Sequence, residues 1–156
     1  MTDMLELRVR SGKKPETTNS LPHSQLTQHG PDEIVEKLHE WCFSLAHVVN
    51  KASGVAPPGT RALILDSQIE GNSNAFMVGR EFAHIHPHPD NGSMHIQLTA
   101  EDAREVVEKG WGENHYLVDQ GQLPVGLVLV FSPRDDTDLE ILKTIVQRSY
   151  DYANQN

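Results

Sequence analysis

The fold of this chain is decided between residues 80 and 98, which read Arg80-Glu81-Phe82-Ala83-His84-Ile85-His86-Pro87-His88-Pro89-Asp90-Asn91-Gly92-Ser93-Met94-His95-Ile96-Gln97-Leu98. Apolar and polar residues alternate on both sides of the Pro- and Gly-containing centre: the apolar set is Ala83, Ile85, Met94 and Ile96, and the polar set is His84, His86, His95 and Gln97. This alternation predicts an antiparallel hairpin that turns through residues 87–92, with Ile85 opposite Met94 and His84 opposite His95.

The predicted register gathers three histidines on one face of the hairpin. Directly opposite side chains in an antiparallel pair have Cβ atoms about 5 Å apart, so His84, His86 and His95 become neighbours. A slip by one residue would bury these imidazoles and expose the apolar set, so the alternation favours this register. By the same alternation, Glu81 is expected on the opposite face.

Composition indicates one folded domain preceded by a polar arm. Residues 1–30 contain many Ser, Thr, Asn, Gln, Pro and Gly residues with little apolar periodicity, so we predict a flexible N-terminal arm there. Residues 31–156 are predicted to form a single domain, since a chain of this length can bury one core.

Charge and cysteine content exclude several classes of partner. The chain carries 13 Lys and Arg residues against 22 Asp and Glu residues, and residues 31–156 hold nine of the former and 19 of the latter. So acidic a domain repels phosphate backbones and anionic lipid, which disfavours nucleic acid and membranes as partners. The longest apolar run, residues 127–131, is too short to span a bilayer. With a single cysteine, Cys42, and no signal peptide, the sequence predicts a cytoplasmic protein.

Periodicity along the chain predicts an α+β fold. We expect a helix over residues 31–50, strands over 60–66, 76–86 and 93–98, a helix over 99–110, an irregular segment over 111–124, a strand over 125–131 and a last helix that begins with a capping box at Thr137 and Glu140. This order, α-β-β-β-α-β(-β)-α, predicts a mostly antiparallel sheet with helices on one face and the histidines on the other. It is similar to the YjbR-like and secretion-chaperone-like architectures.

Four blocks of sequence carry a resemblance to a known family. They are residues 80–86, residues 94–98, Glu108-Lys109-Gly110-Trp111-Gly112-Glu113-Asn114-His115, and Phe131-Ser132-Pro133-Arg134-Asp135. Together they resemble the fungal luciferase-like domain family, which includes bacterial luciferase-family proteins, over roughly residues 80–152. His84, His86, His95, Trp111 and His115 match the shared motif, whereas Tyr116 and residues 118–119 depart from it.

The resemblance implies an activity. Fungal luciferase oxidises 3-hydroxyhispidin, a hydroxypyrone, with molecular oxygen and releases carbon dioxide and light, without a metal or organic cofactor. By this resemblance the chain is expected to be a cofactor-independent oxygenase, a luciferase-like dioxygenase with molecular oxygen as co-substrate and a planar, enolisable small molecule as substrate.

The histidines suit that chemistry as catalytic residues. An imidazole has an unperturbed pKa of about 6.5 and can accept a proton near neutral pH, so His84, His86, His95 and His115 are assigned base and hydrogen-bonding roles. Trp111 is expected to stack on a flat ring. Arg80, Phe82 and Gln97 complete the expected substrate-binding set, and the ordinary alternative for Trp111 is a core position at the end of a helix.

Two further readings of the same residues remain open. Two histidines at positions i and i+2 of a strand, with a third across the hairpin, also have the spacing of a zinc, iron or copper site, so His84, His86 and His95 are the metal ligands if a metal is bound. Asp90, in the hairpin loop, could join such a site. The other alternative is a protein that binds a small molecule or a metal without catalysis.

Overall fold

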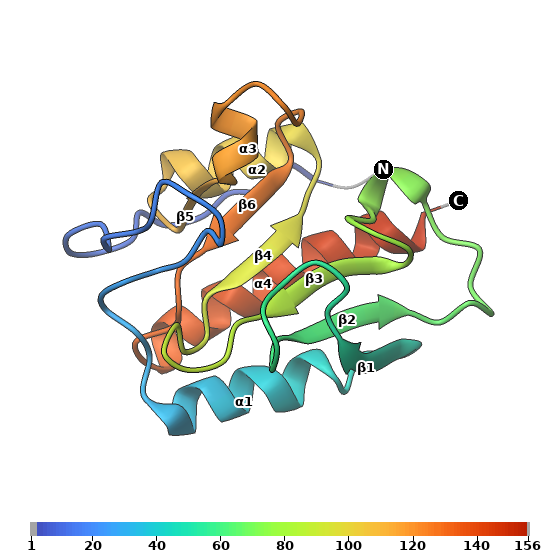
Figure 1. Ribbon diagram of the computed structural model, residues 1–156, viewed down its shortest axis with the longest axis horizontal. Coiled ribbons are helices and arrows are strands. Elements are labelled where there is room, and N and C mark those ends of the chain that lie inside the picture. The colour runs from blue at the N-terminus through green and yellow to red at the C-terminus, as the bar shows by residue number, and fades with distance from the viewer. Residues whose placement is uncertain (1–2, 156) are drawn as a thin grey trace.

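One six-stranded antiparallel sheet organises the part of the chain that the computed structural model describes, residues 3–155. Its strands follow the spatial order β1-β2-β3-β4-β6-β5 (Figure 1). Their bounds are Val48–Ala52 for β1, Arg61–Leu65 for β2, Glu81–Ile85 for β3, Met94–Gln97 for β4, Gly112–Asn114 for β5 and Leu127–Val130 for β6. The predicted α+β class with a mostly antiparallel sheet is confirmed, and the likeness to YjbR-like and secretion-chaperone-like architectures stays a prediction.

Of the four helices, α1, α2 and α4 cover one face of this sheet. Their bounds are Asp32–Cys42 for α1, Ala100–Glu108 for α2, Tyr116–Asp119 for α3 and Asp136–Asn154 for α4, and a short 3-10 helix spans Ser73–Ala75. Helix α4 packs against β3 and β4, α2 packs against β5 and β6, and α1 packs against α4 (Figure 1). The hydrophobic core lies between these helices and the sheet. No helix of residues 3–155 has the length and apolar character that a bilayer crossing requires.

The histidine hairpin has the register that the sequence predicts. Strands β3 and β4 pair antiparallel with Ile85 opposite Met94 and His84 opposite His95. Ile85 and Met94 are fully buried in the core, so the imidazoles of the paired histidines occupy the face that the helices leave uncovered.

Glu81 departs from the prediction, because strand β3 contains a β-bulge. Leu63 of β2 pairs with Ala83, but the next residue, Ile64, pairs with Glu81, so Phe82 has no partner. A bulge of this kind interrupts the two-residue period of side-chain direction. Phe82 and Ala83 consequently both belong to the core, and the carboxylate of Glu81 lies on the histidine face, 2.7 Å from Nδ1 of His84.

Several predicted boundaries are corrected. The first helix ends at Cys42 rather than near residue 50, because the backbone turns at His47, which has a φ of 67°, and strand β1 follows. The segment expected to be irregular, residues 111–124, contains β5 and α3. The last helix is capped by Asp135, whose side chain accepts a hydrogen bond from the backbone N–H of Asp138, and not by the box at residues 137 and 140.

The N-terminal segment, residues 3–30, runs along the domain rather than away from it. Leu5 and Leu7 are buried in the core, and the backbone N–H of Arg10 donates to the carbonyl of Lys109. After a turn, Thr17 and Gln25 form an isolated bridge, and in Figure 1 this blue segment passes beside β5 and β6. The segment predicted to be a flexible arm therefore has buried contacts, and it contributes a side chain to the site described next.

Candidate functional site

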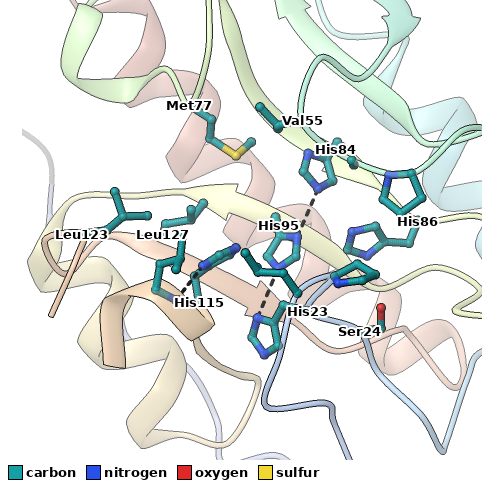
Figure 2. Close-up of a pocket in the computed structure, with 15 residues that line it drawn as sticks. His23, Ser24, Val55, Met77, His84, His86, His95, His115, Leu123 and Leu127 are labelled. Carbon is teal, nitrogen blue, oxygen red and sulfur yellow. Dashed lines mark hydrogen bonds between the residues drawn. The ribbon is translucent and has the colours of Figure 1, made fainter. Parts of the chain in front are cut away.

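A pocket of about 570 Å³ lies on the uncovered face of the sheet. Three segments that are distant in sequence form its walls together with Met77 (Figure 2): residues 21–24, the loop 55–57 between β1 and β2, and residues 117–127. Most of these wall residues are apolar: Leu21, Pro22, Val55, Ala56, Pro57, Met77, Leu117, Leu123 and Leu127. A pocket of this size and lining is typical of small-molecule sites, which measure about 300–1,000 Å³.

Five histidines line the polar part of this pocket: His23, His84, His86, His95 and His115. A chain of hydrogen bonds connects three of them. Nε2 of His84 lies 3.1 Å from Nδ1 of His95, and Nε2 of His95 lies 3.3 Å from Nδ1 of His23. A carboxylate ends the chain on each side, since Glu81 lies 2.7 Å from Nδ1 of His84 and Glu113 lies 2.6 Å from Nε2 of His23.

His86 has hydrogen-bond partners of its own. Its Nδ1 lies 2.9 Å from the hydroxyl of Ser93 and 3.3 Å from a carboxylate oxygen of Asp90. The Ser93 hydroxyl donates to the other oxygen of Asp90 at 2.7 Å. Asp90 is thus held beside His86, as the sequence allowed, and the backbone N–H of Gln25 also donates to it.

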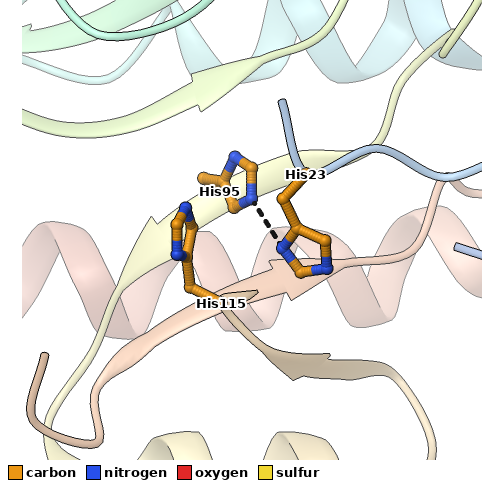
Figure 3. A group of neighbouring side chains, drawn as sticks. All are labelled: His23, His95 and His115. Carbon is orange, nitrogen blue, oxygen red and sulfur yellow. Dashed lines mark hydrogen bonds between the residues drawn. The ribbon is translucent and has the colours of Figure 1, made fainter. Parts of the chain in front are cut away.

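His23 and His115 both lie beside His95, although they belong to segments that are distant in sequence. Figure 3 shows the three rings close together, with His23 on the N-terminal segment and His115 at the N-terminus of α3. The ring centroids of His95 and His115 are 4.8 Å apart, and those of His23 and His115 are 5.4 Å apart. Nδ1 of His115 accepts a hydrogen bond from the backbone N–H of Leu117, which leaves its Nε2 free to face a ligand.

The surroundings keep most of these imidazoles neutral. Burial, followed by the neighbouring imidazoles, holds the pKa of His95 well below its usual range. Burial is also the main cause that lowers the pKa of His86 to about 3 and that of His115 to about 4. Burial alone would raise the pKa of Glu81, but hydrogen bonds from His84, Gly54 and Ser53 outweigh it and the pKa is lowered. At neutral pH the site therefore offers neutral nitrogens flanked by carboxylates.

Replacing Glu113 with Gln is expected to lower stability in a pH-dependent way. Burial alone would raise its pKa, but His23, Lys14 and Thr17 together lower it from 4.5 to about 2. Because the folded state has the lower pKa, the stabilisation is present in full above pH 4.5 and disappears as the pH falls toward 2. For a side chain that is 17% exposed, we expect a loss on the order of 2 kcal/mol at pH 7, measured by urea unfolding. If the difference in unfolding free energy between the wild type and Glu113→Gln did not shrink as the pH falls, this assignment would be contradicted.

Two residues expected to bind substrate lie in the core instead. Trp111 is 2% exposed, and its indole N–H donates to the carbonyl of Arg8. Phe82 is fully buried because the bulge turns it toward the helices, where it packs against Tyr150. Trp111 thus lies where the core alternative places it, and neither ring lines the pocket.

Arg80 and Gln97 also lie outside the pocket. The guanidinium of Arg80 donates to the carbonyls of Leu65, Asp66, Ile69 and Glu70, so it closes the loop that follows β2. Gln97 shares the face of His95, but its side-chain amide meets the carbonyl of Leu98, and the residue does not line the pocket. The structure thus brings together the four expected catalytic histidines but none of the expected substrate-binding residues.

Local sequence patterns do not point to the other members of the cluster. His23 lies in a polar segment without periodicity, and only the folded chain brings it to the hairpin. Glu113 lies in a segment expected to be irregular. His88, although close in sequence, is exposed and pairs with Asp32 at 2.8 Å, so it takes no part in the site.

Fold and site together define an antiparallel α+β domain with a histidine-lined pocket on the uncovered face of its sheet. In a comparison with known families, residues 79–149 match the Luciferase domain. This range contains the whole hairpin, extends into α4 and includes four of the five clustered histidines. Over these residues the chain is similar to a fungal luciferase-like domain, as its sequence motifs predict.

Curated relatives agree with this assignment. The chain is 36% identical to luciferases of Armillaria mellea and Armillaria gallica and 35% identical to luciferase of Neonothopanus nambi, in each case over 79 residues that make up 49% of this chain. The alignment covers 29% of the length of each relative. No solved structure matches the chain.

Proposed function

We propose that this domain catalyses the oxygen-dependent oxidation of a planar, enolisable small molecule of the hydroxypyrone type. The observation that carries the proposal is the convergence of five imidazoles on one side of an apolar pocket, within a domain related to fungal luciferases. A protein that only binds its ligand has no need of so many buried titratable groups, because each is costly to bury.

The geometry supplies the parts that such a reaction needs. Neutral imidazole nitrogens of His86 and His95 can take the proton of an enol, because a neutral nitrogen is the basic form. Nε2 of His115 can donate a hydrogen bond to an oxygen of the enolate, since its Nδ1 accepts from Leu117. Apolar walls exclude water and admit dioxygen, which is itself apolar.

The proposed reaction balances without an external reductant. The deprotonated hydroxypyrone supplies the electrons, and dioxygen forms a carbon–oxygen bond to each of the two ring carbons that flank the lactone O–C=O unit. This unit leaves as carbon dioxide when its carbon–carbon and carbon–oxygen bonds to those two carbons break. Cleavage of the O–O bond then leaves one oxygen atom of dioxygen on each of the two carbons. The proton taken by the histidines returns to the ring-opened product.

Charge and cysteine content support a small molecule as the partner and a cytoplasmic setting. The net charge of −9 disfavours nucleic acid and anionic membrane surfaces as ligands. Cys42 is buried in the core as a free thiol, as is common in a reducing compartment.

Oxygen uptake tests the proposal directly. With 3-hydroxyhispidin as the probe, we expect the purified protein to consume one dioxygen per substrate molecule and to release one carbon dioxide, and photon counting in the same cell records any light. Saturable binding of the probe without oxygen consumption would contradict catalysis and favour a binding protein.

A further inference from the structure

The hydrogen bonds around His84 and His86 fix which nitrogen of each ring is free. Oε2 of Glu81, which also accepts from the hydroxyl of Ser53, accepts from Nδ1 of His84. The Ser93 hydroxyl gives its only proton to Asp90, so it must accept from Nδ1 of His86. In its neutral form, each ring then carries its one N–H on Nδ1 and presents an unprotonated Nε2 that can bind a metal ion.

The hydrogen bonds of His23 place the N–H of His95 on Nε2 rather than on Nδ1. Nε2 of His23 donates to the carboxylate of Glu113, and Nδ1 of His23 accepts from the backbone N–H of Tyr116 at 3.3 Å. Nδ1 of His23 therefore carries no proton, and His95 must donate to it through Nε2. This leaves Nδ1 of His95 unprotonated, 3.1 Å from Nε2 of His84.

A positive ion has to lie between these two nitrogens, either a proton carried by Nε2 of His84 or a bound metal ion. We propose that His84, His86 and His95 bind a divalent first-row transition metal ion through Nε2, Nε2 and Nδ1, with the open coordination position facing the pocket. The proposal does not rest on the proposed function, because it concerns the arrangement of nitrogens in the substrate-free protein. It differs from the cofactor-free chemistry that the family resemblance implies.

Burial and distances support this site. The three residues are 3–5% exposed, and one nitrogen from each lies within 4.8 Å of the others. Metal–imidazole bonds of about 2.0–2.1 Å place tetrahedral ligands about 3.3 Å apart. The His84–His95 pair already has this spacing, and the remaining nitrogen has to approach by at most about 1.5 Å.

The surrounding carboxylates suit a dication. Glu81 orients His84 from behind, and Asp90 with Ser93 orients His86, which is the usual arrangement around metal-binding histidines because the carboxylate fixes the ring and raises its basicity. The two negative charges also balance the two positive charges of the metal. Three neutral imidazoles favour zinc, iron, copper or nickel over magnesium or calcium.

A second group of nearby nitrogens, from His23, His95 and His115, is a poorer site. His23 has no free nitrogen, because one accepts from Tyr116 and the other donates to Glu113. Nδ1 of His115 accepts from Leu117. This leaves His115 as a hydrogen-bond donor to a ligand rather than a ligand of the metal.

Bound in this position, a metal ion would occupy the nitrogens that otherwise serve as bases, and its positive charge would favour the enolate in their place. The chain's own residues would then orient the substrate through the N–H of His115 and exclude water with the apolar walls.

Titration with Co²⁺ tests the proposal without any substrate. Tag-free full-length protein is treated with chelator, dialysed and titrated, and binding is followed by calorimetry and by the visible absorption bands of Co²⁺. We expect one Co²⁺ per chain, bands of a four- or five-coordinate ion, and loss of binding in His86→Gln. Exposed His88 on the same hairpin provides the matched control, and His88→Gln is expected to bind as the wild type does.

A second variant keeps the test decisive if His86→Gln fails to fold, which circular dichroism would report. Glu81→Gln keeps all three ligands and is expected to weaken Co²⁺ binding about 10- to 100-fold. The proposal is overturned if the wild type takes up no Co²⁺, or if both variants bind as the wild type does. Loss of binding in His115→Gln but not in His86→Gln would place the metal in the second group and would equally overturn it.

Discussion

Replacing His95 with Gln is expected to lower oxygen uptake with 3-hydroxyhispidin by about 100- to 10,000-fold, the range found when a group that transfers a proton is removed. His95 is the only histidine that contacts both ends of the cluster, since its Nδ1 faces His84 and its Nε2 faces His23. A Gln side chain can keep at most one of these contacts with correct geometry. The measurement is the initial rate in an oxygen electrode at saturating substrate.

The control for this variant is His88→Gln, which removes an exposed imidazole from the same hairpin and should leave the rate within about twofold of the wild type, because surface substitutions away from a site rarely matter. Far-UV circular dichroism and a melting curve verify that His95→Gln is folded. A folded His95→Gln protein with more than half of the wild-type rate would contradict a role for His95 in the reaction.

Replacing Phe82 with Ala is expected to cost about 3–5 kcal/mol of unfolding free energy, which is a large part of the stability of an ordinary domain. Phe82 is fully buried and occupies the bulge that directs Glu81 to the histidine face. Its removal leaves a cavity between β3 and α4. Denaturation in guanidinium chloride measures the loss.

Val78→Ala is the matched control for the core substitution, because Val78 is an apolar residue that is 42% exposed only a few positions away. A change within about 0.5 kcal/mol is expected for it. If Phe82→Ala lost less than about 1 kcal/mol, Phe82 would not have the core position that the structure assigns to it.

The histidine hairpin could be predicted from sequence because the pattern that specifies it lies within a few neighbouring residues. Alternation of apolar and polar residues fixes which side chains share a face, and the burial of Ile85 and Met94 fixes the register. The pattern therefore predicts that His84, His86 and His95 share one face, where the structure places them. His115 was found by the family motif rather than by periodicity.

The rest of the site depends on features that alternation does not encode. A single unpaired residue, Phe82, reverses the predicted direction of Glu81. His23 reaches the cluster only because the N-terminal segment packs across the sheet, and the hydrogen bonds that hold it there come from Glu113 and Tyr116. Trp111, which comes shortly after the end of α2, is buried in the core.

The central claim is that hydrogen-bond partners hold the clustered imidazoles in defined tautomers, with free nitrogens facing one another and the pocket. Long-range ¹H–¹⁵N correlation spectra of protein labelled at histidine read the tautomer of each ring directly. For metal-free protein at neutral pH, the structure predicts an N–H on Nδ1 of His86 and on Nε2 of both His23 and His115. Averaged signals for these rings, or an N–H on Nε2 of His86, would contradict the account.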